Sequence, residues 1–206
     1  MAFDVAQAER GQSVRPERSR GALIGLAVAL LAAVAWAHAA GFHTRLTFTV
    51  SRSLVQGLLV MDVDAGERCS LLRAQADLDH DGLLSRDERA LLAKKLTGMA
   101  TRNLSIGVSS AVVPLAVKDT RLSIREDPRV SDTGLSLALL LELPTPYPIT
   151  PGSTLEVTDT SPDLSPVLLE VFQTPAEGAK AEPPFRGEVE AGKQVKVRLG
   201  ILGGTR

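Results

Sequence analysis

Residues 135–143 read LSLALLLEL, a stretch in which leucine occupies every odd-numbered position. Alternate residues of a β-strand point to opposite faces, so this pattern predicts a strand with one face buried in a core. Pro144, Pro146 and Pro148 follow directly. Proline lacks the backbone N–H that further sheet pairing would need, and we therefore expect the strand to end at residue 143.

Shorter alternating runs on both sides of this stretch predict further strands. In one of them Leu46, Phe48 and Val50 alternate with polar residues. By the same rule we expect strands at residues 45–50, 104–108 and 195–201. Residues 58–63, 155–157 and 167–172 are further candidate strands. Short strands separated by Pro, Gly and Asp turns are typical of a small antiparallel β-sandwich.

The periodicity changes between the second and the third predicted strand. Apolar residues recur there at helical spacing over residues 69–76 and again over 92–99. We therefore expect an α+β fold in which a helix-loop-helix, at about residues 66–100, is inserted into a β-rich domain of residues 40–174. The run PAEGAKAEPP then indicates that residues 175–206 form a linker and a C-terminal strand or tail.

The N-terminus has the pattern of a secretory signal. Four arginines lie within residues 1–20, an apolar stretch follows at 22–35, and the small residues of Ala37-His38-Ala39 come next. This order predicts a signal peptide over residues 1–39 with cleavage before Ala40, or alternatively before His38. The competing interpretation is an uncleaved anchor helix at 21–40, which is long enough to cross a bilayer. Either interpretation places the remaining chain outside the cytoplasm, in the periplasm or the extracellular medium.

Composition excludes several classes of function. The 206 residues carry a net charge of −1, and a nucleic-acid-binding protein would need a basic face. One cysteine permits neither an intramolecular disulfide nor a multi-cysteine zinc site. The three histidines are His38, His43 and His80, and none is placed by the sequence for nucleophilic catalysis, so we do not expect an enzyme. Cys69 fits a small buried hydrophobe, with a redox or intermolecular role as the alternative.

Residues 77–88, DLDHDGLLSRDE, match the twelve-residue calcium loop of an EF-hand. Calcium takes six to eight oxygen ligands, and the loop supplies them at fixed positions. Gly82 occupies the sixth position, where the chain turns sharply, and Leu84 occupies an apolar position that packs on a core. The predicted ligands are the carboxylates of Asp77, Asp79, Asp81 and Glu88, the backbone carbonyl of Leu83, and Ser85 directly or through a water.

Two alternatives to calcium remain for this loop. Ser85 and Glu88 also fit a capping box at the start of a helix, which would explain them without any ion. That interpretation leaves the three aspartates at alternate positions unexplained, because they repel one another without a cation. Another hard cation such as magnesium is the second alternative, although a bidentate glutamate at the twelfth position favours the larger ion.

The chain contains a single such loop, whereas EF-hands usually pair through their loops. We therefore expect either a homodimer that brings two loops together or a β-domain that supports Leu84 directly. The N-terminal region offers one further metal hypothesis. If cleavage follows Ala37, the amino terminus and the imidazoles of His38 and His43 could chelate a transition metal.

The order of these parts resembles a known group of bacterial exported proteins. The resemblance covers residues 37–173 and rests on the Ala37-His38-Ala39 exit, the loop DLDHDGLLSRDE and the strand LSLALLLELP. The group comprises periplasmic proteins associated with nickel and cobalt transporters and the extracytoplasmic segment of HupE/UreJ-type permeases. The resemblance implies a β-rich domain with an inserted calcium hand and a link to metal transport through a membrane partner.

The sequence therefore predicts an exported, non-enzymatic calcium-binding protein. Its calcium ion would be structural or would modulate contact with a partner. The alternative is a periplasmic accessory of a nickel/cobalt-type transport system that hands an ion to a membrane protein. A third possibility is a membrane-anchored scaffold whose leucine-rich strands bind a partner.

Overall fold

The computed structural model describes residues 41–124, 128–145, 148–161, 165–200 and 202–203. Within these residues the chain forms ten strands and two α-helices. The chain divides into two units, residues 1–37 and 38–206, and all described residues belong to the second. The predicted β-rich α+β class is confirmed. The strands form one six-stranded and one four-stranded sheet.

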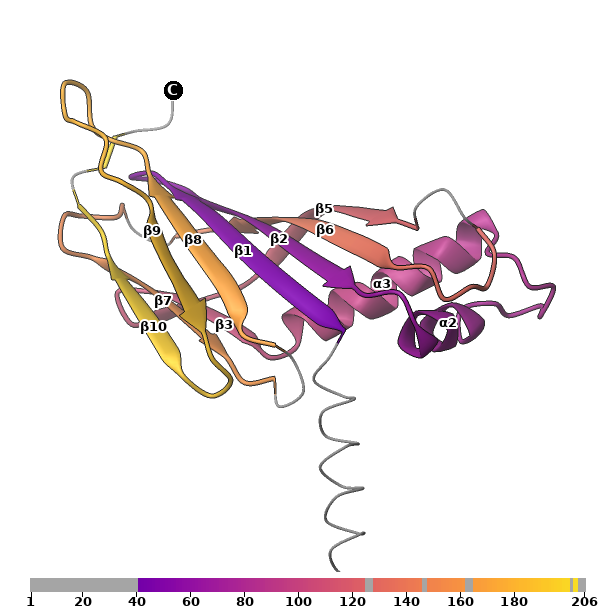
Figure 1. The fold of residues 1–206 in the computed structure, drawn as a ribbon. Helices are drawn as coiled ribbons and strands as arrows, with labels where there is room; N and C mark the ends of the chain where they lie inside the picture. The colour runs from indigo at the N-terminus through magenta and orange to yellow at the C-terminus, as the bar shows by residue number, and fades with distance from the viewer. Residues whose placement is uncertain (1–40, 125–127, 146–147, 162–164, 201, 204–206) are drawn as a thin grey trace, which may run out of the picture. The chain divides into compact units, whose positions relative to one another are not determined.

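The larger sheet contains the strand that the alternating leucines of residues 135–143 predict. From one edge to the other, its strands are β5 (Ala116–Ser123), β6 (Leu135–Leu143), β2 (Val55–Val63), β1 (Phe42–Val50), β8 (Val167–Gln173) and β9 (Phe185–Val189) (Figure 1). In β6, Leu137, Leu139 and Leu141 are fully buried, whereas Leu140 between them is 44% exposed. One face of this sheet therefore packs into the core and the other faces solvent.

The expectation of a purely antiparallel sheet is wrong at the centre of this sheet. β1 pairs with β2 in the antiparallel sense, but its other neighbour, β8, runs parallel to it, with Leu46 opposite Leu169. Parallel neighbours need a long crossover, and here the chain passes through both helices and three strands of the smaller sheet before it returns as β8. Alternation along a sequence fixes which face is buried, but it carries no information on strand direction.

The smaller sheet has the order β10 (Gln194–Arg198), β7 (Thr154–Asp159), β3 (Leu104–Val108) and β4 (Ala111–Val113). Its Ile106, Val157 and Val197 belong to the same hydrophobic cluster as the inner face of the larger sheet. β9 contacts both β7 and β10, so the C-terminal hairpin joins the two sheets. Residues 185–189 and 194–198 are thus strands of the sheets, and β10 matches the predicted strand at 195–201 over residues 195–198 only.

The helices are α2 (Glu67–Ala74) and α3 (Arg86–Thr101). α3 contacts β5 and β6, and its Leu92 and Leu96 are fully buried in the common core. Figure 1 shows α3 and the strands β3 and β7 behind the larger sheet. The layer that covers the buried face of this sheet is therefore part helix and part sheet.

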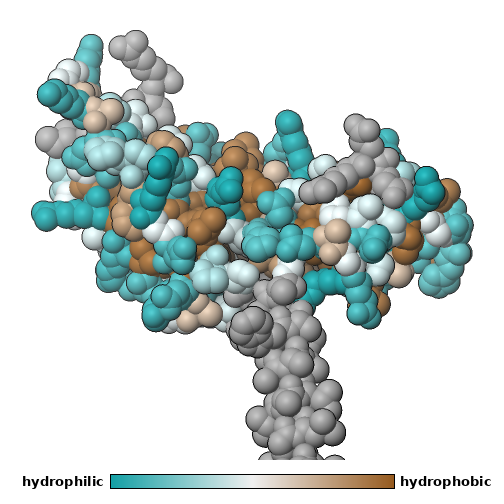
Figure 2. Space-filling model, in the orientation of Figure 1, coloured by the Kyte–Doolittle hydropathy of each residue, from teal (hydrophilic) through white to brown (hydrophobic). Residues whose placement is uncertain are grey.

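The outer face of the larger sheet carries apolar side chains that remain exposed. Leu58 and Leu140 are opposite one another on β2 and β6, and each is 44% exposed. Leu168 and Phe172 of β8 are exposed to a similar extent. Figure 2 shows apolar patches interspersed with hydrophilic residues on this side of the molecule.

No helix among the described residues is long and apolar enough to cross a membrane. The predicted signal peptide at 1–39, the alternative anchor at 21–40 and His38 lie outside the described residues.

Candidate metal centre

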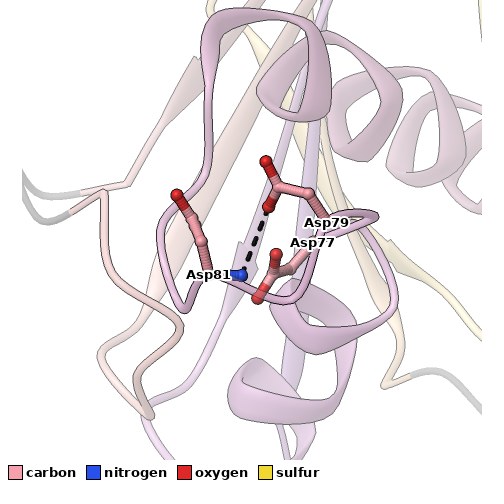
Figure 3. Close-up of side chains that lie close together, drawn as sticks. All are labelled: Asp77, Asp79 and Asp81. Atoms are coloured by element: carbon pink, nitrogen blue, oxygen red, sulfur yellow. Dashed lines mark hydrogen bonds between the residues drawn. The ribbon is translucent and has the colours of Figure 1, made fainter.

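Three aspartates meet in the loop between α2 and α3. Asp77, Asp79 and Asp81 each contribute a carboxylate oxygen to a group whose members lie within 4.8 Å of one another (Figure 3). They come from positions 1, 3 and 5 of the predicted calcium loop. The structure therefore brings together three of the four carboxylates that the sequence assigns to a cation site.

Backbone amides of the loop hold these carboxylates in place. Asp77 Oδ2 accepts a hydrogen bond from Gly82 N (3.1 Å), Asp79 Oδ1 accepts from Asp81 N (3.2 Å), and Asp81 Oδ1 accepts from Leu83 N (2.7 Å). Gly82 has a φ of 80°, a left-handed conformation that glycine adopts without steric cost. The chain thus curls around its own carboxylates as the motif predicts.

Asp77 is the most informative residue of the site. Its side chain is only 6% exposed, and its Oδ1 has no hydrogen-bond partner among the described residues. A buried carboxylate oxygen without a partner is costly, and the two neighbouring aspartates add like-charge repulsion. A cation between the three carboxylates would remove both penalties, which makes this group a candidate metal centre.

Glu88 lies outside this group of oxygens. Its Oε1 accepts a hydrogen bond from Leu78 N (2.6 Å) and its Oε2 accepts one from Ser85 N (2.9 Å). The hydrogen bond with the Ser85 hydroxyl, together with the backbone N–H groups of Ser85 and Leu78, lowers the pKa of Glu88 to about 2. The carboxylate is therefore ionised at neutral pH and is held at the start of α3.

Ser85 is the N-cap of α3. Its Oγ accepts a hydrogen bond from Glu88 N (3.3 Å), which with the Glu88–Ser85 N contact completes a capping box. The alternative that the sequence left open is thus present for these two residues. It does not account for the three aspartates, since none of them caps the helix.

The outer edge of the loop is paired with another part of the same chain. Leu84 N donates to Pro128 O (2.6 Å), Val130 N donates to Gly82 O (2.9 Å), and Leu83 forms an antiparallel bridge with Arg129. The Leu84 side chain is 2% exposed and belongs to the hydrophobic core. The β-domain therefore supports Leu84 directly, which is one of the two arrangements expected from the sequence for a single loop of this kind.

Sequence reasoning missed Arg73, which is fully buried at the end of α2. Its Nη1 donates to Arg129 O (2.9 Å) and to Ser131 Oγ (3.2 Å), and its Nη2 donates to Thr133 O (3.0 Å). An arginine in the last turn of a helix is usually a solvated side chain that interacts with the helix dipole. The oxygens that accept its hydrogen bonds belong to residues 56 to 60 positions further along the sequence, so no local pattern indicates this role.

The remaining candidates stand apart from the aspartate group. Cys69 is buried, its Sγ donates to Asp64 O (3.1 Å), and burial raises the pKa of its thiol, so the group is neutral at pH 7. His43 lies on the surface with its Nε2 3.0 Å from Asp64 Oδ2.

A comparison with known proteins finds no family model that matches the chain and no curated protein that is similar to it. Functional assignment therefore depends on the geometry of the site itself.

Proposed function

We propose that this protein is an exported, non-enzymatic calcium-binding protein with a single EF-hand loop at residues 77–88. The observation that carries the proposal is the unpartnered Oδ1 of buried Asp77, within 4.8 Å of oxygens from Asp79 and Asp81. Buried charged groups in proteins are normally paired or coordinate a metal. Three oxygen donors with no nitrogen or sulfur among them suit a hard cation.

The proposed ligand set extends the aspartate group along the loop. Asp77, Asp79 and Asp81 provide side-chain oxygens, Leu83 provides its backbone carbonyl, and Ser85 contributes directly or through a water. Glu88 completes the set by exchanging its hydrogen bonds from Leu78 N and Ser85 N for the ion. Because that exchange gives up favourable bonds, it lowers the affinity for the ion. An affinity of about 10⁻⁴–10⁻³ M is typical of extracellular calcium modules.

Calorimetric titration of the full chain with calcium tests the proposal, with a mild detergent present because of the apolar run at residues 22–35. We expect one calcium ion per chain, weaker magnesium binding and little nickel heat. The variant Asp77→Ala/Glu88→Ala should abolish calcium binding. The matched control is Asp87→Ala, which removes an exposed carboxylate of the same loop that is not in the ligand set. Calcium binding by the double variant at wild-type affinity would refute the proposal.

A nickel titration of the processed protein, whose amino terminus is free after cleavage, tests the alternative of an accessory to nickel or cobalt transport. Strong nickel binding that survives the Asp77→Ala/Glu88→Ala changes and is lost in His43→Ala would favour that alternative. Export is tested separately by cell fractionation and by mass spectrometry of the mature N-terminus. A chain that begins at Ala40 or at His38 supports cleavage, and a start at His38 supplies the free amino terminus that the nickel alternative requires. Retention of residues 1–39 in washed membranes supports the anchor.

A further inference from the structure

Residues 128–133 lie between the candidate calcium loop and α2, and they form hydrogen bonds with both. On one side are the backbone hydrogen bonds to Gly82 and Leu84 and the bridge to Leu83. On the other side, Arg73 donates to three oxygens of this segment, and Gly66 N donates to Asp132 O (2.7 Å). The segment therefore connects the loop to the helix that precedes it.

The pairing with this segment determines which groups of the loop face the aspartates. Leu84 N–H and the Gly82 carbonyl both point outward, to Pro128 and Val130. In an extended strand the N–H and the carbonyl of the intervening residue point the opposite way. Leu83 N–H does so, since it donates to Asp81 Oδ1 (2.7 Å). The Leu83 carbonyl, the proposed backbone ligand, is thereby directed to the same inner side.

We propose that residues 128–133 act as a built-in partner strand that sets the cation affinity of the loop, with Arg73 as its positioning residue. The segment takes the place that the loop of a second EF-hand would otherwise occupy. This inference rests on the proposed function, and in particular on the unpartnered Asp77 Oδ1 within the aspartate group.

The coupling must operate in both directions. A change in the segment that alters the calcium affinity implies that calcium alters the stability of the segment by the same factor. Residues 128–133 precede β6, the strand next to the exposed edge strand β5. Calcium bound at the loop would therefore also stabilise the connection that leads into β6.

Two substitutions test the role of the segment in the full chain. Val130→Pro removes the N–H that donates to Gly82 O. Arg73→Met removes the three donor contacts while keeping an unbranched apolar side chain about as long as the aliphatic part of arginine. Each should weaken calcium binding in calorimetric titration about tenfold, the scale found when groups that orient metal ligands are removed. The control is Val157→Ala in the smaller sheet, which lowers the thermal stability but should keep the wild-type affinity.

Hydrogen exchange on the wild-type chain gives a second measurement that does not depend on a variant folding. Saturating calcium should slow exchange of the Leu84 and Val130 amides about tenfold or more, by the coupling above. Exchange of the Ser109 amide, which donates to Thr154 O in the smaller sheet, should not change.

The outcomes separate the two proposals. If the wild-type chain binds no calcium, the proposed function fails and this inference fails with it. If the wild-type chain binds calcium but Val130→Pro and Arg73→Met bind it equally well, and the two amides are unaffected, only the partner-strand inference is overturned.

Discussion

The two carboxylate oxygens of Asp77 have different surroundings. Oδ2 accepts the Gly82 N–H, whereas Oδ1 is buried beside two further carboxylates without a partner among the described residues. If the loop binds a cation as proposed, Asp77 should cost stability in the absence of the ion and contribute stability in its presence. This opposite dependence distinguishes a metal ligand from a residue that only shapes a turn.

Asp77→Asn is expected to separate these two contributions. Without calcium the variant should unfold at the same temperature as wild type or higher, because one of three close negative charges is gone. At a calcium concentration of 100 times its dissociation constant, wild type should gain about 2.7 kcal/mol, and the variant should lose most of this gain. Thermal unfolding in chelator and in calcium measures both effects. Equal calcium gains for the two proteins would contradict the assignment.

Ser109 and Ser110 form the turn between β3 and β4 in an unfavourable backbone conformation. Their φ angles are 51° and 69°, in the left-handed region that serine rarely adopts. Two-residue hairpins of this kind prefer asparagine and then glycine. Ser109→Asn should therefore raise the free energy of unfolding, by about 0.5–1 kcal/mol, in a urea titration. A loss of stability would show that the Ser109 side chain contributes more than the strain costs.

Glu156 gives the stability of the fold a pH dependence that does not involve the candidate metal centre. Its hydrogen bond with Lys196 is the main cause of a pKa below the ordinary value of 4.5, and Thr154 and Ser110 also donate to it. Since the pKa is lower in the folded state, the carboxylate stabilises the fold above pH 4.5, and this contribution is lost as the pH falls below that value.

Thermal unfolding of Glu156→Gln between pH 6 and pH 3 tests this sign. The variant should be less stable than wild type at pH 6, and the difference should narrow towards pH 3. Glu188→Gln, which removes an exposed carboxylate of β9, is the control. A difference that stays constant over this range would show that Glu156 contributes through packing alone.

At the scale of the element, α3 begins with a complete capping box. Ser85→Ala removes the side-chain acceptor for Glu88 N, and in calcium-free solution it should lower the free energy of unfolding by about 1 kcal/mol. Arg86→Ala, one position later and exposed, should change it by less than about 0.5 kcal/mol. Equal effects of the two substitutions in denaturant titrations would argue against a stabilising cap.

Elements with one buried face could be predicted from sequence, whereas three of the four edge strands, β4, β5 and β9, could not. β1, β2 and β6 alternate regularly, and the predicted strands include most of their residues. β5 is exposed along most of its length and β4 has only three residues, so neither produces a clear period of two. Phe185–Val189 follows a linker-like run, and its pairing with β8 is visible only in the fold.

The candidate site shows the same division between local and distant information. Asp77, Asp79 and Asp81 are fixed by spacing within twelve residues, and the structure brings their oxygens together. The contacts of residues 128–133 with Arg73 and with the loop join segments far apart in the sequence, so no local pattern indicates them. The two possible roles of Glu88, cap and ligand, require the same residue at the same position, which is why sequence alone left both open.

At the scale of the whole molecule, the two faces of the larger sheet differ in what they contribute. Leu139→Ala removes a fully buried side chain from the inner face and should cost about 2–5 kcal/mol. Leu140→Ala, the next residue, removes a side chain that is 44% exposed and should cost well under half as much. Urea titrations of the two variants measure this contrast. Similar losses would mean that something covers the outer face in solution.

The parallel pairing of β1 with β8 has a consequence for the time at which the protein can fold. β1 ends at Val50, but one of its two neighbours is complete only at Gln173, so the centre of the larger sheet cannot close until most of the chain has been synthesised. Pairing over such a separation slows folding, because closing the long loop costs entropy before the contacts between the two strands can offset that cost. Residues 51–166 must be made before β8 can add to β1, so this order of strands delays completion of the larger sheet until late in synthesis.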